Sequence, residues 1–118
     1  SKSLLTKPSA FDRLHVRRLF IYLEQQIKES AKYLLFELNN ASTRNYAVNI
    51  FEPILRYVAG AGGIYSYSIV CDETNNTADI IDQNLMVCTI MVAPAKSIDW
   101  IRLDFVCTKT GETTYSES

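Results

Sequence analysis

Three apolar runs in the second half of the chain limit its possible folds most strongly: 64–71, 85–93 and 98–108. The middle run, LMVCTIMVA, is apolar at nearly every position, which predicts a strand covered on both faces. The last run alternates, which is typical of a half-buried strand whose inward residues are Ile101, Leu103, Phe105 and Cys107. Because only a polar tail follows, the sequence predicts an open sheet edge there, available for pairing with another chain.

Two stretches before these runs have helical spacing. Apolar residues recur at steps of three and four over 12–38 and again over about 44–59, where Ser42 or Thr43 is the expected N-cap. Pro53 lies inside the second stretch and predicts a kink or a break. A loop at 94–97 is short enough for a hairpin within one chain.

These elements predict an α+β fold. Two helices would pack on one face of a small mixed, mainly antiparallel sheet of about three to four strands, with an open edge for strand addition. The predicted core gathers residues from both helices and the strands: Leu19, Leu23, Ile27, Phe51, Leu55, Val87, Ile90, Leu103 and Phe105.

The length of 118 residues is that of one domain. We expect a linker at 1–11, the domain at 12–110 and a flexible polar tail at 111–118. With 47% hydrophobic and 21% charged residues, the composition is that of a soluble globular protein, and neither a membrane span nor a secretory signal is apparent. The first residue is Ser, which fits either Met removal or a fragment of a longer protein. The interpretation is a cytosolic chain, whose net charge of -1 gives no general attraction to nucleic acid or membranes.

No residue pattern in the chain predicts catalysis, a cofactor or a metal. The three cysteines, one in each predicted strand, are odd in number, which excludes a complete disulfide framework and predicts reduced, buried thiols. The single histidine, His15, has no closely spaced partner for zinc, and no nucleophile, base and acid are grouped. We therefore expect a protein that is not an enzyme.

Two features leave alternatives open. The acidic loop 72–82 lacks the spacing of an EF-hand. We expect a bend at Asn75 and Asn76 followed by one helical turn capped by Thr77. The alternative is a small-ligand-binding or enzymatic α+β domain in which this loop and Tyr65 or Tyr67 line a pocket.

The second open feature is a basic cluster in the first turns of the first helix, where the helix dipole disfavours positive charge. Its residues are Arg13, Arg17 and Arg18. The cluster is either a solvated face or a contact for an anionic partner.

Two segments resemble one known family. LHVRRLFIYLEQQIKESAKYLLFELNN and VCDETNNTADIIDQNLMVCTIMVAPAKSIDWIRLDF resemble the C-terminal domain of contractile tail sheath proteins, which occur in myophages, R-type pyocins and related contractile injection systems. The resemblance covers about residues 12–108. Leu38 departs from it, since many relatives have a proline there in an FEPN-like segment, and Pro53 is also unusual for the family.

The resemblance implies a structural role in a virion. Sheath subunits would form six-fold rings stacked along the tail tube, with the baseplate and tail terminator at the ends, after assembly in the host bacterial cytoplasm. This domain would form the inner layer, and extended arms from neighbours would complete its sheet and keep the subunits linked during contraction. If the basic cluster contacts an anionic partner, the resemblance implies that this partner is the tube; otherwise the cluster is a solvated face. The predicted inter-subunit strand comprises Asp99, Trp100, Ile101, Arg102, Leu103, Asp104, Phe105 and Val106.

Overall fold

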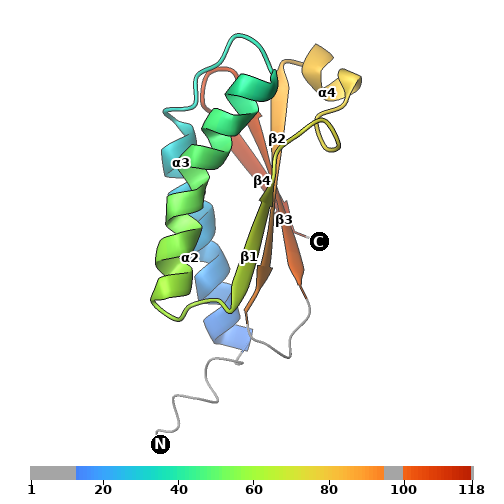
Figure 1. Ribbon diagram of the computed structural model, residues 1–118. Coiled ribbons are helices and arrows are strands. Elements are labelled where there is room, and N and C mark those ends of the chain that lie inside the picture. Colours follow the sequence, from blue (N-terminus) through green and yellow to red (C-terminus); the bar gives the residue numbers. More distant parts are fainter. Residues whose placement is uncertain (1–12, 95–99, 118) are drawn as a thin grey trace, which may run out of the picture.

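The structure is a computed structural model that describes residues 13–94 and 100–117. Its four strands, β1 (Ser66–Val70), β2 (Leu85–Ala93), β3 (Ile101–Thr108) and β4 (Thr113–Glu117), form one sheet in the order β1-β2-β3-β4. Helices α2 (Arg13–Ala31) and α3 (Ala41–Gly60) pack together along one face of this sheet, and the short α4 (Ala78–Asp82) lies beside β2 (Figure 1). The predicted α+β class is therefore confirmed. Every strand pair is antiparallel, so the sheet is not mixed.

Strand β2 has the bounds that the sequence predicts, but its two faces differ. The residues facing the helices, Met86, Cys88, Ile90 and Val92, are buried. On the other face Leu85, Val87 and Met91 are only half-buried, because both long helices lie on the opposite side (Figure 1). The prediction that both faces of this strand are covered is wrong, and so is the placement of Val87 in the core.

The core otherwise follows the prediction. Leu23, Ile27, Phe51, Leu55 and the strand residues Ile90, Leu103 and Phe105 are all buried in one cluster between the helices and the sheet, while Leu19 packs against its margin. Strands β2 and β3 pair within one chain, as expected for a short connection, with Ile90 opposite Leu103. The residues at 95–99 in this connection lie outside the described part of the chain.

Helix α2 ends at Ala31, seven residues before the predicted end at Leu38. Leu34 and Phe36 are buried and Leu35 is exposed, so the chain here alternates as an extended segment does. The Phe36 amide donates to the Lys109 carbonyl at the β3–β4 turn over 3.4 Å. Contact with a segment distant in sequence thus overrides a helical pattern of leucines.

Helix α3 continues through Pro53 without a break, so the prediction of a split is wrong. Pro53 and Asn49 are both exposed, and the Asn49 carbonyl freed by the proline is therefore accessible to water. The N-cap is Asn40 rather than Ser42 or Thr43, because the Asn40 side chain accepts a 2.9 Å hydrogen bond from the Thr43 amide.

The predicted flexible tail at 111–118 is wrong over Thr113–Glu117, which forms β4. Gly111 adopts φ +92° in the turn before it, a conformation that favours glycine. A Cβ at this position would lie 3.0 Å from the Lys32 carbonyl oxygen, so the turn fits closely against the end of α2. The Tyr115 ring then packs on Phe105, with 5.2 Å between centroids. The glycine turn is a sequence signal for a hairpin, but the segment TTYSE has no alternation of apolar and polar residues that would predict a strand.

Candidate subunit interface

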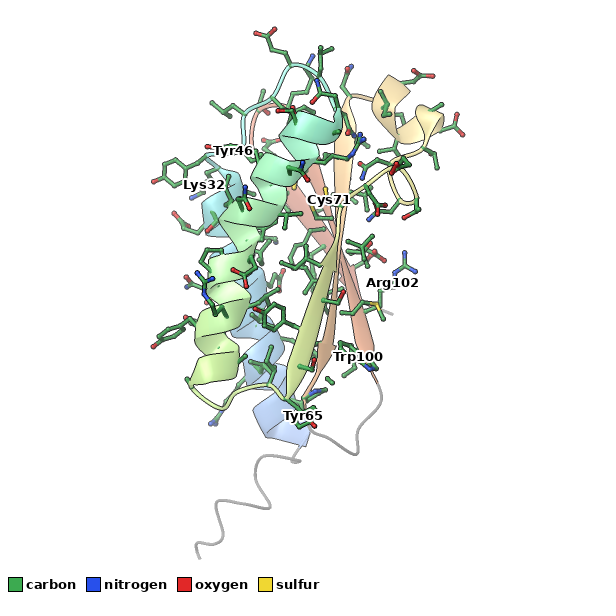
Figure 2. The ribbon with its side chains drawn as sticks, in the orientation of Figure 1. Lys32, Tyr46, Tyr65, Cys71, Trp100 and Arg102 are labelled. Atoms are coloured by element: carbon green, nitrogen blue, oxygen red, sulfur yellow. The ribbon has the colours of Figure 1, made fainter. Side chains whose placement is uncertain are left out.

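Strand β3, the predicted inter-subunit strand, lies inside the sheet. It pairs with β2 from Ile101 to Thr108 and with β4 from Leu103 to Cys107. The prediction of an open edge along this strand is therefore wrong, because β4 occupies it. Trp100 is about half exposed just before the start of β3 (Figure 2), and Asp99 lies outside the described residues.

The outward side chains of β3 are engaged within the domain. Arg102 projects from the sheet face opposite the helices (Figure 2), and its Nε lies 3.1 Å from the Asp104 carboxylate. The Thr89 hydroxyl donates to the same carboxylate over 2.7 Å. These polar residues interrupt the half-buried apolar residues of the outer sheet face.

The two outer strands, β1 and β4, form the sheet's edges among the described residues. Residues near β1 already contact that strand. The Asn75 side chain donates to the Val70 carbonyl over 2.8 Å, and the Tyr67 hydroxyl donates to Glu52 of α3 over 2.6 Å. This hydrogen bond, together with burial and the negative charge of Glu52, raises the pKa of Tyr67 above its ordinary value. These contacts hold the inward face and the end of β1 against α3 and the following loop.

The edge at β4 has a shallow hollow beside it. The hollow measures about 100 Å³ and lies between Tyr115 and the first half of α2, with Arg17, Phe20, Ile21 and Glu24 as its other lining residues. Ile21 is 46% exposed although it lies beside the core residue Phe20. A strand added next to β4 would have a partly apolar floor beneath its inward side chains.

The register of β4 indicates which backbone groups face away from β3. The Thr108 amide donates to the Glu112 carbonyl over 2.8 Å, which marks these two as a hydrogen-bonded pair. By the alternation of an antiparallel ladder, Thr114 and Ser116 then bond to β3, whereas the backbone groups of Thr113, Tyr115 and Glu117 point outward. The outward groups of Thr113 and Glu117 lie on the side where an incoming strand would pair.

The start of α2 carries exposed positive charge. Arg17 and Arg18 are exposed, and neither makes an ion pair with another described residue. Arg18 also borders a groove of about 340 Å³ between α2 and α3 that includes Leu19, Tyr22, Tyr57 and Val58. The side chain of Arg13 lies outside the described residues.

Three exposed apolar side chains lie in the segment that follows the C-terminal end of α2. Tyr33, Leu35 and Leu38 are 75%, 65% and 68% exposed. Leu35 and Phe36 also line a hollow of about 540 Å³ beside Lys109 at the β3–β4 turn.

The polar side chains of the loop 72–82 bond within the loop and to β1 and β2. The amide and hydroxyl of Thr74 donate to the Asp72 carboxylate, which holds the pKa of Asp72 below its ordinary value of 3.8. Tyr65 is exposed, and none of the hollows described above includes it or this loop. Thr77 precedes α4 as predicted but makes no side-chain cap hydrogen bond. The loop's polar groups are used to fix its own conformation.

Cys71, Cys88 and Cys107 are free and buried, as predicted. Within residues 13–94 and 100–117, no three His, Cys, Asp or Glu side chains group as metal ligands. None of the described helices has the length and hydropathy required to cross a bilayer.

Comparison with known proteins identifies the family. The model of the phage tail sheath C-terminal domain matches residues 6–108, which is most of the chain. The chain belongs to the phage tail sheath C-terminal domain family. No solved structure matches it significantly.

Three tail sheath proteins show how this sheath domain relates to complete proteins. It is 49% identical over 110 residues to the tail sheath protein of Enterobacteria phage T4, an alignment covering 93% of this chain and 17% of the relative. Identity is 47% with that of Vibrio phage KVP40 (92% of this chain, 16% of the relative) and 49% with that of Salmonella phage ViI (92% and 17%). The chain thus spans about one sixth of these relatives. They are structural proteins and not enzymes, as expected from the sequence, and this removes the support for the enzymatic alternative.

Proposed function

We propose that this chain serves as the C-terminal domain of a structural subunit in a contractile phage tail sheath. The observation that carries the proposal is the family match over residues 6–108, together with relatives at 47% to 49% identity that are tail sheath proteins. In this proposal the domain is located in the virion tail and, during assembly, in the cytoplasm of the host bacterium.

The proposed partners are other sheath subunits, arranged in six-fold rings stacked along the tail tube, with the baseplate and tail terminator at the ends. The domain would form the inner layer of the sheath. Arg17 and Arg18, exposed and without ion pairs among the described residues, would meet an acidic surface of the tube. Arg13 belongs to the same proposed contact by its position at the start of α2.

We further propose that subunits are linked by a strand from a neighbour that adds to the free edge of β4. The outward backbone groups of Thr113 and Glu117 would bond the strand, and the hollow bordered by Ile21 would receive an inward side chain. Because the incoming strand would move with the domain while its connecting arm bends, the link would persist when rings rotate. Strand β3 cannot take this part without displacing β4.

A proline substitution tests the linking edge. Thr113→Pro in the full-length sheath protein removes an outward amide hydrogen at the first residue of β4, a position where a strand tolerates proline. The bonds between β3 and β4 at Thr114 and Ser116 are kept. We expect a folded subunit whose assembly requires a roughly tenfold higher protein concentration, since one backbone hydrogen bond and close strand approach are lost. Sedimentation and electron microscopy of assembled sheath measure this change.

Thr113→Val is the matched control, because it alters the side chain and keeps the amide hydrogen. It should assemble as the unsubstituted protein does. Circular dichroism and the Tm of each variant establish that the subunit remains folded. Assembly of a folded Thr113→Pro variant at the unsubstituted protein's concentration would rule out strand addition at β4 and leave the family membership intact.

A further inference from the structure

Two of the three buried cysteines lie directly opposite each other on neighbouring strands. The ladder between β1 and β2 pairs Ser66 with Ala93 and Val70 with Thr89. Cys71 follows Val70 and Cys88 precedes Thr89, so one more step in the same register places the two cysteines face to face. Directly opposed residues in an antiparallel pair have Cα atoms about 4.5 to 5.5 Å apart, and a disulfide accepts about 4.4 to 6.8 Å.

The side chains of this pair also point to the same face. Cys71 continues the inward series of Tyr67 and Ile69, and Cys88 belongs to the inward residues of β2. Their Sγ atoms are 3.0 Å apart, with the Cys88 thiol donating to Cys71. This separation is only about 1 Å longer than a covalent S–S bond of roughly 2.05 Å. Figure 2 shows Cys71 between the sheet and α3.

We propose that Cys71 and Cys88 are a cross-strand disulfide site, which is reduced in a cytoplasm and closes when the protein meets a small-molecule disulfide in oxidising surroundings. The inference concerns the folded domain alone and does not depend on the function proposed above. Cys107 is also buried on the inward face, on β3, but no hydrogen bond joins it to either of the other thiols. It is therefore the matched thiol that stays reduced.

The two thiols have different parts in the reaction. The hydrogen bond from Cys88 and the positive charge of Arg44 lower the pKa of Cys71, whereas the same hydrogen bond and burial raise the pKa of Cys88. Cys71 is 8% exposed and Cys88 is fully buried. Cys71 is thus the thiol that reacts first, once the loop 72–76 opens locally.

The exchange balances in two steps. The Cys71 thiolate attacks one sulfur of the small disulfide and releases one small thiolate, leaving a mixed disulfide on Cys71. The Cys88 sulfur then loses its proton and attacks the Cys71 sulfur, and the second small thiolate leaves. The two protein thiols lose two electrons and two protons in total, and the small disulfide becomes two thiols.

Closing this bond joins the end of β1 to β2 across the loop 72–87. A cross-link around a loop of this length reduces the conformational entropy of the unfolded chain. The oxidised protein should therefore show a Tm about 10 °C above that of the reduced protein. Treatment with dithiothreitol should return the Tm to the reduced value.

Oxidised glutathione at pH 8 is the probe, applied to the protein purified under reducing conditions. The intact mass should fall by two hydrogens, about 2 Da, with no glutathione retained. Trypsin leaves both cysteines on the single peptide Tyr57–Lys96 and Cys107 on another, because no Lys or Arg lies between 57 and 95. A second cleavage before Asp72, Asp79 and Asp82 separates Cys71 from Cys88. The two halves should then remain joined until dithiothreitol is added.

Variants give a second and independent readout. Cys71→Ala should abolish the mass loss and the rise in Tm, whereas Cys107→Ala should keep both. The proposal is overturned if the folded protein keeps Cys71 and Cys88 as free thiols, if it retains glutathione on Cys71 without closing the bond, or if Cys107 is found in the linked peptide. Peptide mapping of the unsubstituted protein decides among these outcomes even if a variant does not fold.

Discussion

At the scale of single residues, Asn76 has the most demanding environment. It is 2% exposed, and its side chain donates to the carbonyls of Asp72 and Val87 at 3.0 and 2.9 Å. Its Oδ1 accepts from the Val87 amide and from Asn39 at 2.8 and 2.9 Å. Asn76 therefore joins the loop that follows β1 to two other segments: strand β2 and the residues that precede α3. The sequence predicted only a bend at this residue.

Asn76→Asp tests this residue with almost no change of shape. The carboxylate still accepts two hydrogen bonds but cannot donate. The Asp72 carbonyl keeps its 3.0 Å bond from the Asn76 backbone amide, whereas the Val87 carbonyl loses the donor that the Asn76 side chain supplied. We expect the free energy of unfolding to fall by about 2 to 5 kcal/mol in urea denaturation. Asn45→Asp, on the exposed surface of α3, is the control and should change it by less than about 0.5 kcal/mol. A similar small effect at both positions would mean that water satisfies the Val87 carbonyl.

At the scale of elements, β3 has one face in the core and the other on the outer surface of the sheet. Leu103 and Phe105 are fully buried beneath the helices, whereas Val106 is half-buried on the opposite face. With β2 on one side and β4 on the other, the strand has little freedom to shift its register. Each inward residue of β3 should therefore contribute strongly to the stability of the domain.

Leu103→Ala and Val106→Ala compare the two faces of the strand. Leu103→Ala should lower the free energy of unfolding by about 2 to 5 kcal/mol, through lost transfer energy and a residual cavity. Val106→Ala should cost about 1 kcal/mol or less, because solvent already reaches that side chain. Chemical denaturation of both variants measures the difference. A loss below about 1 kcal/mol for Leu103→Ala would contradict the assignment of faces.

At the scale of the whole molecule, the helical layer has chemically different ends. Arg17 and Arg18 are exposed near the start of α2, while Lys32 lies just past its end and pairs with Glu29 at 3.3 Å. The free edge of β4 runs beside the start of α2. The proposed tube contact and the proposed linking edge would thus be adjacent.

Charge reversal tests whether the arginines at the start of α2 contact the tube. Arg17→Glu with Arg18→Glu, in the full-length protein, should leave the Tm nearly unchanged and weaken sheath assembly on isolated tubes. The defect should be largest at low salt, where charge repulsion is least screened. Lys32→Glu is the control and should assemble normally. If the double variant assembles on tubes at low salt as well as the control does, the two arginines are only a solvated face.

The sequence alone determined the local elements of this protein. The bounds of β2, the inward face of β3 and most of the core follow from periodicity, because burial on one side imposes a period of two on strands and 3.6 on helices. The family also follows from the sequence, since the segments that resemble tail sheath proteins lie within the matched residues 6–108. Each of these properties depends on neighbouring residues along the chain.

Only the tertiary structure decided where elements end and what covers them. Helix α2 stops at Ala31 because Leu34 and Phe36 pack as an extended segment beside the β3–β4 turn. The edge of β3 is closed because Tyr115 packs on Phe105 and draws the polar C-terminal residues into the sheet. The opposition of Cys71 and Cys88 depends on the register of two strands. Contacts between residues that are distant in sequence fix all three features. The free energies of these contacts cannot be predicted from the pattern of neighbouring residues.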